Sequence, residues 1–168
     1  MAVTIDGAGP LAGATTLNGL TIPTTGFGKV LQVVRATDTT NRSTTSTSFV
    51  DVTGMSVTIT PQKITSIVLV IATGRLNSSR AAAADTSVHL QITDSSNIGL
   101  SGARDTLFGD FPANRVFNVG FNIIGYEVPG TLSPVAYKLR MRSENTAITT
   151  TCQNTYQDGQ LYAIEVSA

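Results

Sequence analysis

Few residues in this chain carry the side chains that enzymes use for chemistry. Its 168 residues include one histidine, His89, and one cysteine, Cys152. His89 falls on the polar side of an alternating segment, so we expect a solvent-facing or interface residue rather than a general base. Cys152 shares a side with Ile148 and Thr150, which predicts a small packed residue rather than a reactive thiol. A single cysteine also excludes a disulfide framework and a cysteine-based zinc site.

Carboxylates are the remaining candidates for acid–base chemistry. Spacing alone does not exclude a glycosidase-type pair, but the acidic residues are scattered through turns and strand ends, which favours structural use. The candidates are Asp105, Asp110, Glu127 and Glu144. No phosphate-binding loop, metalloprotease helix, calcium loop or nucleophile elbow occurs. We therefore predict a protein that is not an enzyme, with no catalytic residue, no metal and no cofactor.

Charge and hydropathy narrow the range of partners. Eleven basic residues balance eleven acidic ones, and charged residues make up only 13% of the chain, against about 25% in ordinary domains. Without a basic surface we expect no nucleic-acid binding. The longest apolar stretch, residues 67–72, is far shorter than the roughly 20 residues of a membrane helix. No basic region followed by an apolar run begins the chain, so we also expect no signal peptide.

From Val30 onward, short alternating segments separated by turn residues predict β-strands. Clear examples cover residues 55–60, 87–92, 117–123 and 135–142. The 26 threonines and 14 serines suit the exposed side of such strands, because a branched side chain fits the pleat while its hydroxyl faces water. Residues 67–71 are apolar on both sides, which predicts a central strand or one whose outer side meets a neighbouring subunit. The pattern predicts an all-β antiparallel sandwich.

The first 28 residues differ from the rest of the chain. They contain six glycines, two prolines and a single charged residue, Asp6, and show no sustained period. We predict an extended N-terminal arm over residues 1–28 and a β-sandwich domain over residues 29–168. An arm that lies against another surface and a partly disordered terminus are both open. For the first case, the apolar candidates for interaction are Ile5, Leu11, Leu17, Leu20 and Ile22.

Several segments of the sandwich domain resemble a recurrent module of tailed-phage virion proteins. They are residues 28–35 (GKVLQVVR), 45–61 (TSTSFVDVTGMSVTITP), 66–74 (SIVLVIATG) and the closing 161–166 (LYAIEV). The similarity covers most of residues 28–168 and is sharpest over residues 28–74. The start of the chain, VTIDG at residues 3–7, is also similar to the starts of such phage structural proteins. The motif consists of strand and turn residues and includes no catalytic signature.

The resemblance implies a jelly-roll-like or C1q/TNF-like sandwich that assembles as a homotrimer on the virion surface, after synthesis in the host cytoplasm. Because only about 28 residues precede the sandwich, it implies a capsid decoration (cement) protein bound to the major capsid protein or another virion protein. The alternative is a tail-fibre or head-fibre domain that recognises host glycans through the loops at residues 103–112 and 145–155. A chain with 6% aromatic residues and no tryptophan argues against sugar stacking.

Overall fold

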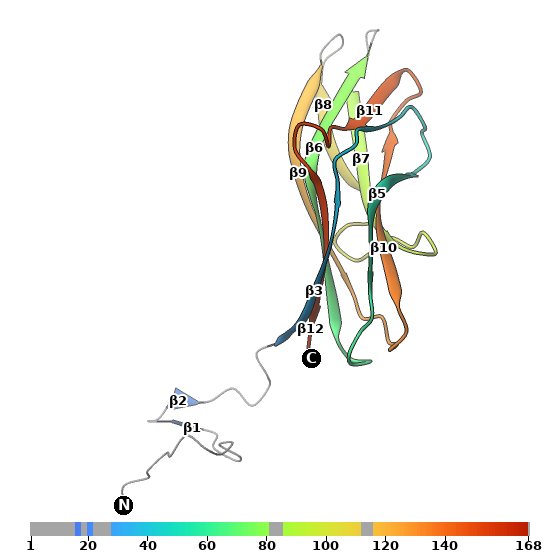
Figure 1. Ribbon diagram of the computed structural model, residues 1–168. Helices are drawn as coiled ribbons and strands as arrows, with labels where there is room; N and C mark the ends of the chain where they lie inside the picture. Colours follow the sequence, from blue (N-terminus) through green and yellow to red (C-terminus); the bar gives the residue numbers. More distant parts are fainter. Residues whose placement is uncertain (1–15, 18–19, 22–27, 81–85, 112–115, 168) are drawn as a thin grey trace, which may run out of the picture.

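The computed structural model describes residues 16–17, 20–21, 28–80, 86–111 and 116–167. Two antiparallel sheets pack face to face (Figure 1), which confirms the predicted all-β sandwich. The strands are β1 (Thr16–Leu17), β2 (Leu20–Thr21), β3 (Val30–Asp38), β4 (Arg42–Thr44), β5 (Val50–Ile59), β6 (Ile67–Arg80), β7 (Thr86–Asp94), β8 (Thr106–Phe111), β9 (Phe117–Glu127), β10 (Val135–Ser143), β11 (Ile148–Cys152) and β12 (Gly159–Val166).

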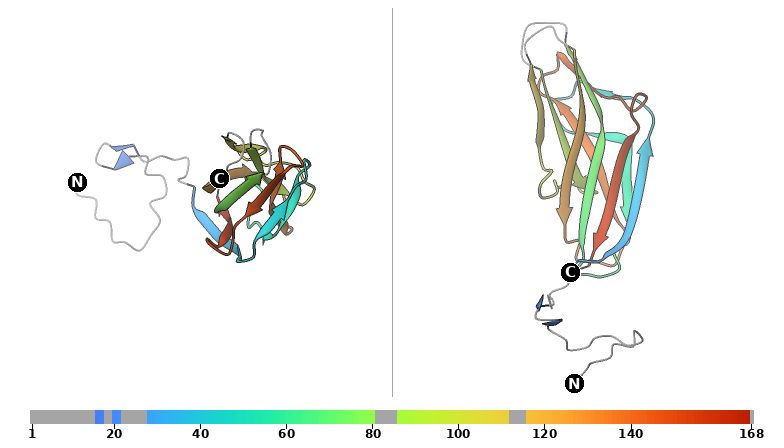
Figure 2. Two further views of the ribbon diagram at one scale, coloured as in Figure 1. Left: turned by 90° about the horizontal axis from the view of Figure 1, so that it is seen from above. Right: turned by 90° about the vertical axis from the view of Figure 1, so that its left-hand side faces the viewer.

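The chain passes repeatedly between the two sheets. A four-stranded sheet has the order β5-β10-β7-β8, and a six-stranded sheet has the order β3-β12-β6-β11-β4 with β9 paired to the other side of β6. The strands β12 and β11 pair with successive parts of β6. The view from above in Figure 2 shows the sheets curving around a common interior. This interleaved order is that of a jelly-roll-like sandwich.

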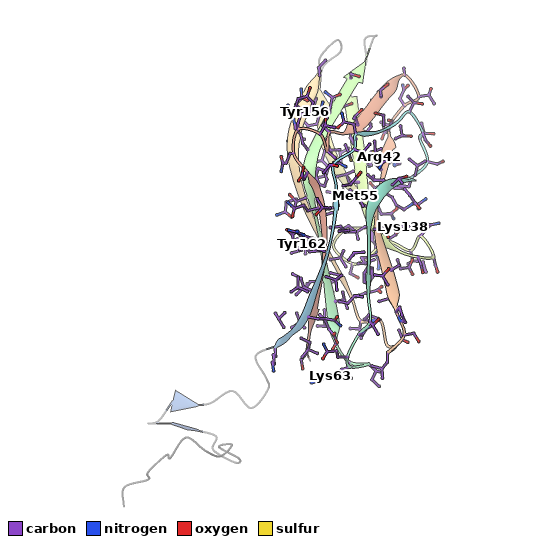
Figure 3. The ribbon with its side chains drawn as sticks, viewed as in Figure 1. Arg42, Met55, Lys63, Lys138, Tyr156 and Tyr162 are labelled. Atoms are coloured by element: carbon purple, nitrogen blue, oxygen red, sulfur yellow. The ribbon has the colours of Figure 1, made fainter. Side chains whose placement is uncertain are left out.

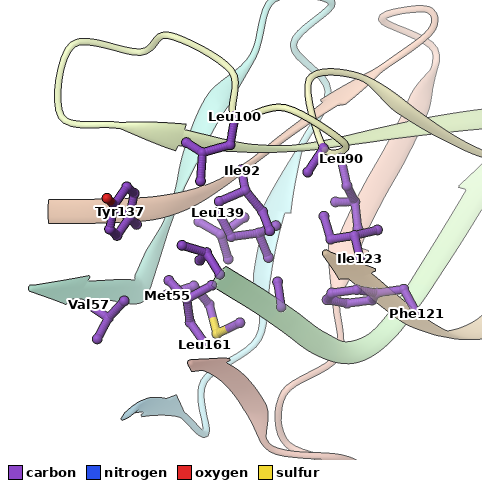
Figure 4. Packing of buried hydrophobic residues seen from close by; sticks show 14 of the residues in the cluster. Met55, Val57, Leu90, Ile92, Leu100, Phe121, Ile123, Tyr137, Leu139 and Leu161 are labelled. Carbon is purple, nitrogen blue, oxygen red and sulfur yellow. The ribbon is translucent and has the colours of Figure 1, made fainter. Parts of the chain in front are cut away.

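Alternation along the strands separates a buried side from an exposed side. On β5, Met55, Val57 and Ile59 are buried, whereas the residues between them are exposed. The same pattern holds on β10, where Tyr137 and Leu139 are fully buried. These side chains meet residues of the opposite sheet in one hydrophobic core (Figure 4). The predicted core faces of residues 55–60, 87–92, 117–123 and 135–142 are therefore confirmed.

The strand β6 lies in the middle of the six-stranded sheet, as the doubly apolar segment at residues 67–71 predicted. It has β12 on one side and β9 on the other. Val68 and Val70 point into the core and are fully buried. Leu69 and Ile71 point to the outer side and are only half-buried. The core therefore explains the apolar character of one side of β6 but not of the other.

Two local predictions differ from the structure. Residues 77–80 (Asn-Ser-Ser-Arg) have residue types that predict a turn, but none forms, because β6 continues through them and pairs with β11 as far as Arg80 and with β9 as far as Ser78. Pairing on both edges outweighs the turn preference of the Asn and Ser side chains. The loops predicted at residues 103–112 and 145–155 contain the strands β8 and β11, respectively. Both strands are short, and their apolar alternation is weak.

The described part of the arm contains one pair of strands. Leu17 on β1 pairs with Leu20 on β2, and Thr16 pairs with Thr21. These two strands precede the sandwich (Figure 1). The other candidate interaction residues of the arm, Ile5, Leu11 and Ile22, lie outside the described residues.

Candidate assembly surface

The outer side of the six-stranded sheet is apolar near the end of the sandwich where β3 begins. In an antiparallel sheet, residues directly opposite each other point to the same side. The register therefore places outward-facing residues of β3, β12, β6 and β9 in rows. We call these rows the apolar face. One row is Val33, Ile164, Leu69 and Tyr126; the next is Arg35, Tyr162, Ile71 and Ile124; the last is Val30, Val166 and Ile67.

The apolar face is accessible in the isolated chain. Val33, Ile124 and Tyr126 are each half or more exposed, and the residues of the two central strands are half-buried except Ile67, which is exposed. Apart from Arg35, the rows hold ten apolar residues, and with strands about 4.8 Å apart and rows about 6.8 Å apart these cover roughly 330 Å². Contiguous apolar patches of this size on a folded domain are often functional. A standard protein interface takes about 800 Å² from each partner, so this face would form about two fifths of one.

The outer side of the four-stranded sheet has the opposite chemistry. There Asp51 on β5 accepts hydrogen bonds from Lys138 Nζ and Arg140 Nε on β10, both at 2.8 Å. Further along β5 the exposed side chains carry hydroxyl groups, as in Ser56 and Thr58. Desolvation works against the charged form of Asp51, but Lys138 and Arg140 outweigh it and lower the pKa of this carboxyl. We call this surface the charged face.

His89 lies on the charged face, on the polar side of β7 as predicted. Its Nδ1 is 2.6 Å from Asp105 Oδ1, and its Nε2 is 2.7 Å from Glu144 Oε2. Arg142 contacts both carboxylates, at 3.3 and 3.5 Å, and closes a ring of four charged or ionisable groups. The His89 side chain is only 12% exposed. Because both ring nitrogens face carboxylates, the geometry suits a structural link better than a general base.

The candidate carboxylates that the structure describes have different partners. Asp105 and Glu144, 39 positions apart in sequence, meet around His89 because β7 lies between β10 and β8. Glu127 accepts a hydrogen bond of 2.7 Å from the Tyr137 hydroxyl. Burial and this carboxylate both raise the pKa of Tyr137, which keeps the phenol protonated as a donor. The side chain of Asp110 lies outside the described residues.

Cys152 is a packed core residue, as predicted. Its Sγ lies 3.8 Å from Met141 Sδ, and its neighbours on the same side of β11, Ile148 and Thr150, are buried too. Burial, with a smaller contribution from the charge of Asp38, raises the pKa of the thiol to about 12. A thiol with this pKa forms almost no thiolate near neutral pH, so it has little nucleophilic character.

The described residues were compared with the requirements of a metal site and of a membrane helix. Within the described ranges, no group of three or more His, Cys, Asp or Glu side chains is arranged to hold a metal ion. No helix in the part of the chain that the structure covers is long and apolar enough to cross a membrane.

No protein-family model matches this chain, and no curated protein is significantly similar to it.

Sequence reasoning found only part of the apolar face. It identified the outward apolar residues of β6 from the run at residues 67–71, but it did not connect them with Ile124 and Tyr126 on β9. Those two residues occupy the exposed positions of an otherwise alternating strand. Apolar residues at both the inner and the outer positions of residues 123–126 were the available signal.

Proposed function

We propose that this chain is a structural protein of a tailed-phage virion, most specifically a homotrimeric capsid decoration protein. In this proposal the sandwiches associate through the apolar face, and the arm of residues 1–28 binds the major capsid protein or another virion protein. The complex stands on the virion surface after assembly in the host cytoplasm. The protein acts by binding and not by catalysis.

The apolar face is the observation that carries this proposal. Burying roughly 330 Å² at about 25 cal/mol per Å² contributes about 8 kcal/mol for each copy. Association costs about 4–15 kcal/mol in lost freedom of motion. The gain and the cost are comparable, so the apolar face supports assembly when other contacts add to it. The apolar face does not indicate which assembly the protein joins. We propose a phage particle because residues 28–74 resemble modules of tailed-phage virion proteins.

Sedimentation at micromolar concentration tests the assembly. We expect a species of three chains, and a monomer would contradict the proposal. Binding to phage heads tests the function. Full-length protein should bind heads that lack it, and a chain without residues 1–27 should bind much more weakly while still forming the same oligomer. Equal binding by both would exclude the arm as the anchor.

One observation supports the alternative of glycan recognition. Tyr156, in the connection between β11 and β12, is 73% exposed, and the Arg75 guanidinium lies 5.3 Å from its ring centroid. An exposed aromatic ring next to a cation is a suitable platform for a sugar. Figure 3 places Tyr156 far from Lys63 along the sandwich. A glycan array probed with the wild type and with Tyr156→Ala distinguishes this alternative, which predicts binding that the substitution removes.

A further inference from the structure

Four segments of the chain converge at one end of the sandwich. Ser167 N donates to Lys29 O at 2.8 Å, and Lys63 Nζ donates to Ser167 Oγ at 2.9 Å. Val166 pairs with Ile67 at the start of β6, and Val135 pairs with Ile59 at the end of β5, so the β5–β6 and β9–β10 connections lie at this same end. We call residues 28–30, 60–67, 127–135 and 166–167 the arm-bearing end, because the N-terminal arm joins the sandwich there (Figure 1).

The connecting loops of the arm-bearing end carry exposed apolar side chains. Ile64 lies in the β5–β6 connection, and Val128 and Leu132 lie in the β9–β10 connection. Each of the three is more than half exposed. Loops between strands are usually polar, because nothing in the domain covers them. Glu127 pairs with Val68 at the end of β9, so the β9–β10 connection begins beside the last row of the apolar face, where Val30 and Ile67 are exposed.

The β5–β6 loop at this end is held by a buried carboxylate. Glu165 is fully buried on β12 and accepts hydrogen bonds from the backbone N–H groups of Gln62 and Lys63, at 2.8 and 3.3 Å. The Gln32 side chain donates to the other oxygen of Glu165. Ser66 N donates to Lys63 O within the same loop. Ile64 is therefore presented on a preformed turn, which lowers the entropic cost of binding.

The charges of the arm-bearing end have one sign. Lys29 and Lys63 are exposed. Among its described residues the carboxylate is Glu127, which is half-buried and accepts a hydrogen bond from Tyr137, and the adjoining Glu165 is buried. The exposed surface of this end therefore combines apolar side chains with lysines. Its complement is a surface with apolar residues flanked by carboxylates.

We infer that the arm-bearing end is a docking surface for the outer surface of a protein shell, with Ile64, Val128 and Leu132 as its apolar contacts. This inference rests on the proposed function and adds an orientation: the sandwich stands with its loops of residues 60–67 and 127–135 against the shell, and with Tyr156 away from it. The arm starts at the same end, so both contacts form together. A tethered second contact raises the overall affinity without changing either one.

The test uses heads stripped of this protein and full-length variants added back. The double substitution Ile64→Asp and Leu132→Asp should reduce the bound fraction at least tenfold, because it replaces two apolar contacts by carboxylates that lose their hydration on docking. Val116→Asp is the matched control, since Val116 is a similarly exposed apolar residue just before β9, at the opposite end of that strand from Glu127, and it should bind as the wild type does. Thermal unfolding and sedimentation of all three proteins should agree, which shows that fold and oligomer are intact.

The possible outcomes separate the inference from the proposed function. If the wild type binds heads and the double variant binds equally well, the orientation is wrong while the decoration function stands. If the wild type does not bind heads, both are wrong. Vesicles of anionic phospholipid are the second probe, because exposed apolar loops with lysines also suit a membrane surface. Capture of the wild type by these vesicles, with loss in the double variant, would overturn docking to a protein shell.

Discussion

The two outer faces of the sandwich differ in chemistry although alternating strands build both. On the four-stranded sheet, outward positions carry hydroxyls, lysine, arginines and carboxylates that pair with one another. On the six-stranded sheet near the arm, outward positions carry Val, Ile, Leu and Tyr in rows that cross four strands, with Arg35 at the β3 edge of one row. Polar groups remain hydrated on a surface that faces water, whereas ions buried against a partner lose their hydration at a cost in free energy. Under the proposed function, the six-stranded side is therefore the one expected to form the interface.

The largest expected effect comes from a charge placed in the apolar face. Ile124→Arg should dissociate the oligomer, because an arginine buried at an interface without a partner loses its hydration. A central contact is worth about 2 kcal/mol or more, or about 30-fold in the dissociation constant. Thr58→Arg, at an exposed position of the charged face, is the control and should leave the oligomer intact. Sedimentation equilibrium measures both, and equal effects would remove the distinction between the faces.

A second comparison concerns one carboxylate from each sheet. Replacing the buried Glu165 by Gln should lower the free energy of unfolding by about 1–3 kcal/mol, because N–H donors lose a charged acceptor. Asp51→Asn on the charged face should cost less than about 1 kcal/mol, since exposed pairs contribute little. Chemical denaturation of both variants measures the difference. A larger loss in Asp51→Asn would mean that the ion pairs of the charged face hold the sandwich together.

The same carboxylates predict a pH dependence. Burial opposes the charge of Glu165, but hydrogen bonds from Gln32 and from the N–H groups of Gln62 and Lys63 outweigh it and lower its pKa below 4.5. The unfolded chain therefore takes up this proton first, so the contribution of Glu165 is complete above pH 4.5 and is lost as the pH falls further. Glu165→Gln should flatten the fall in stability in acid. Denaturation at a series of pH values checks this prediction, and an unchanged slope would contradict it.

A smaller effect is expected from the ring around His89. His89→Gln removes its contacts with Asp105 and Glu144, yet Arg142 still contacts both carboxylates. The expected loss is below about 1 kcal/mol, as for other partly exposed ion pairs. A double-mutant cycle with Arg142→Met isolates the coupling within the ring. A coupling of several kcal/mol would show that the charged face has a structural role comparable with the core.

The smallest effect is expected from salt. Association through apolar rows should change little between about 0.1 M and 1 M sodium chloride, because screening acts on charges and shortens the Debye length from about 10 Å to 3 Å. Sedimentation in both buffers measures the oligomer. Strong dissociation in high salt would instead assign the interface to the charged face.

The sequence was sufficient for the fold class and for the inner faces of the long strands. Alternation in residues such as Val88, Leu90 and Ile92 states which side is buried, because successive side chains of a strand point to opposite faces. It also placed His89 on a polar surface and Cys152 in the core. It was insufficient for β8 and β11, whose short segments carry few apolar residues, and for the extension of β6 through Asn77, where pairing on both edges decides the conformation.

What the sequence alone determined about this protein is local: a two-residue period, a surplus of hydroxyl groups, a charge-poor arm and the absence of the usual catalytic motifs. Which strands become neighbours was decided only in the tertiary structure, since strand pairing depends on long-range contacts that a local period does not encode. Pairing set Asp105 and Glu144 around His89, and it aligned Val33, Leu69 and Tyr126 across three separate parts of the chain. The apolar face exists because of that register, since no single strand contains it.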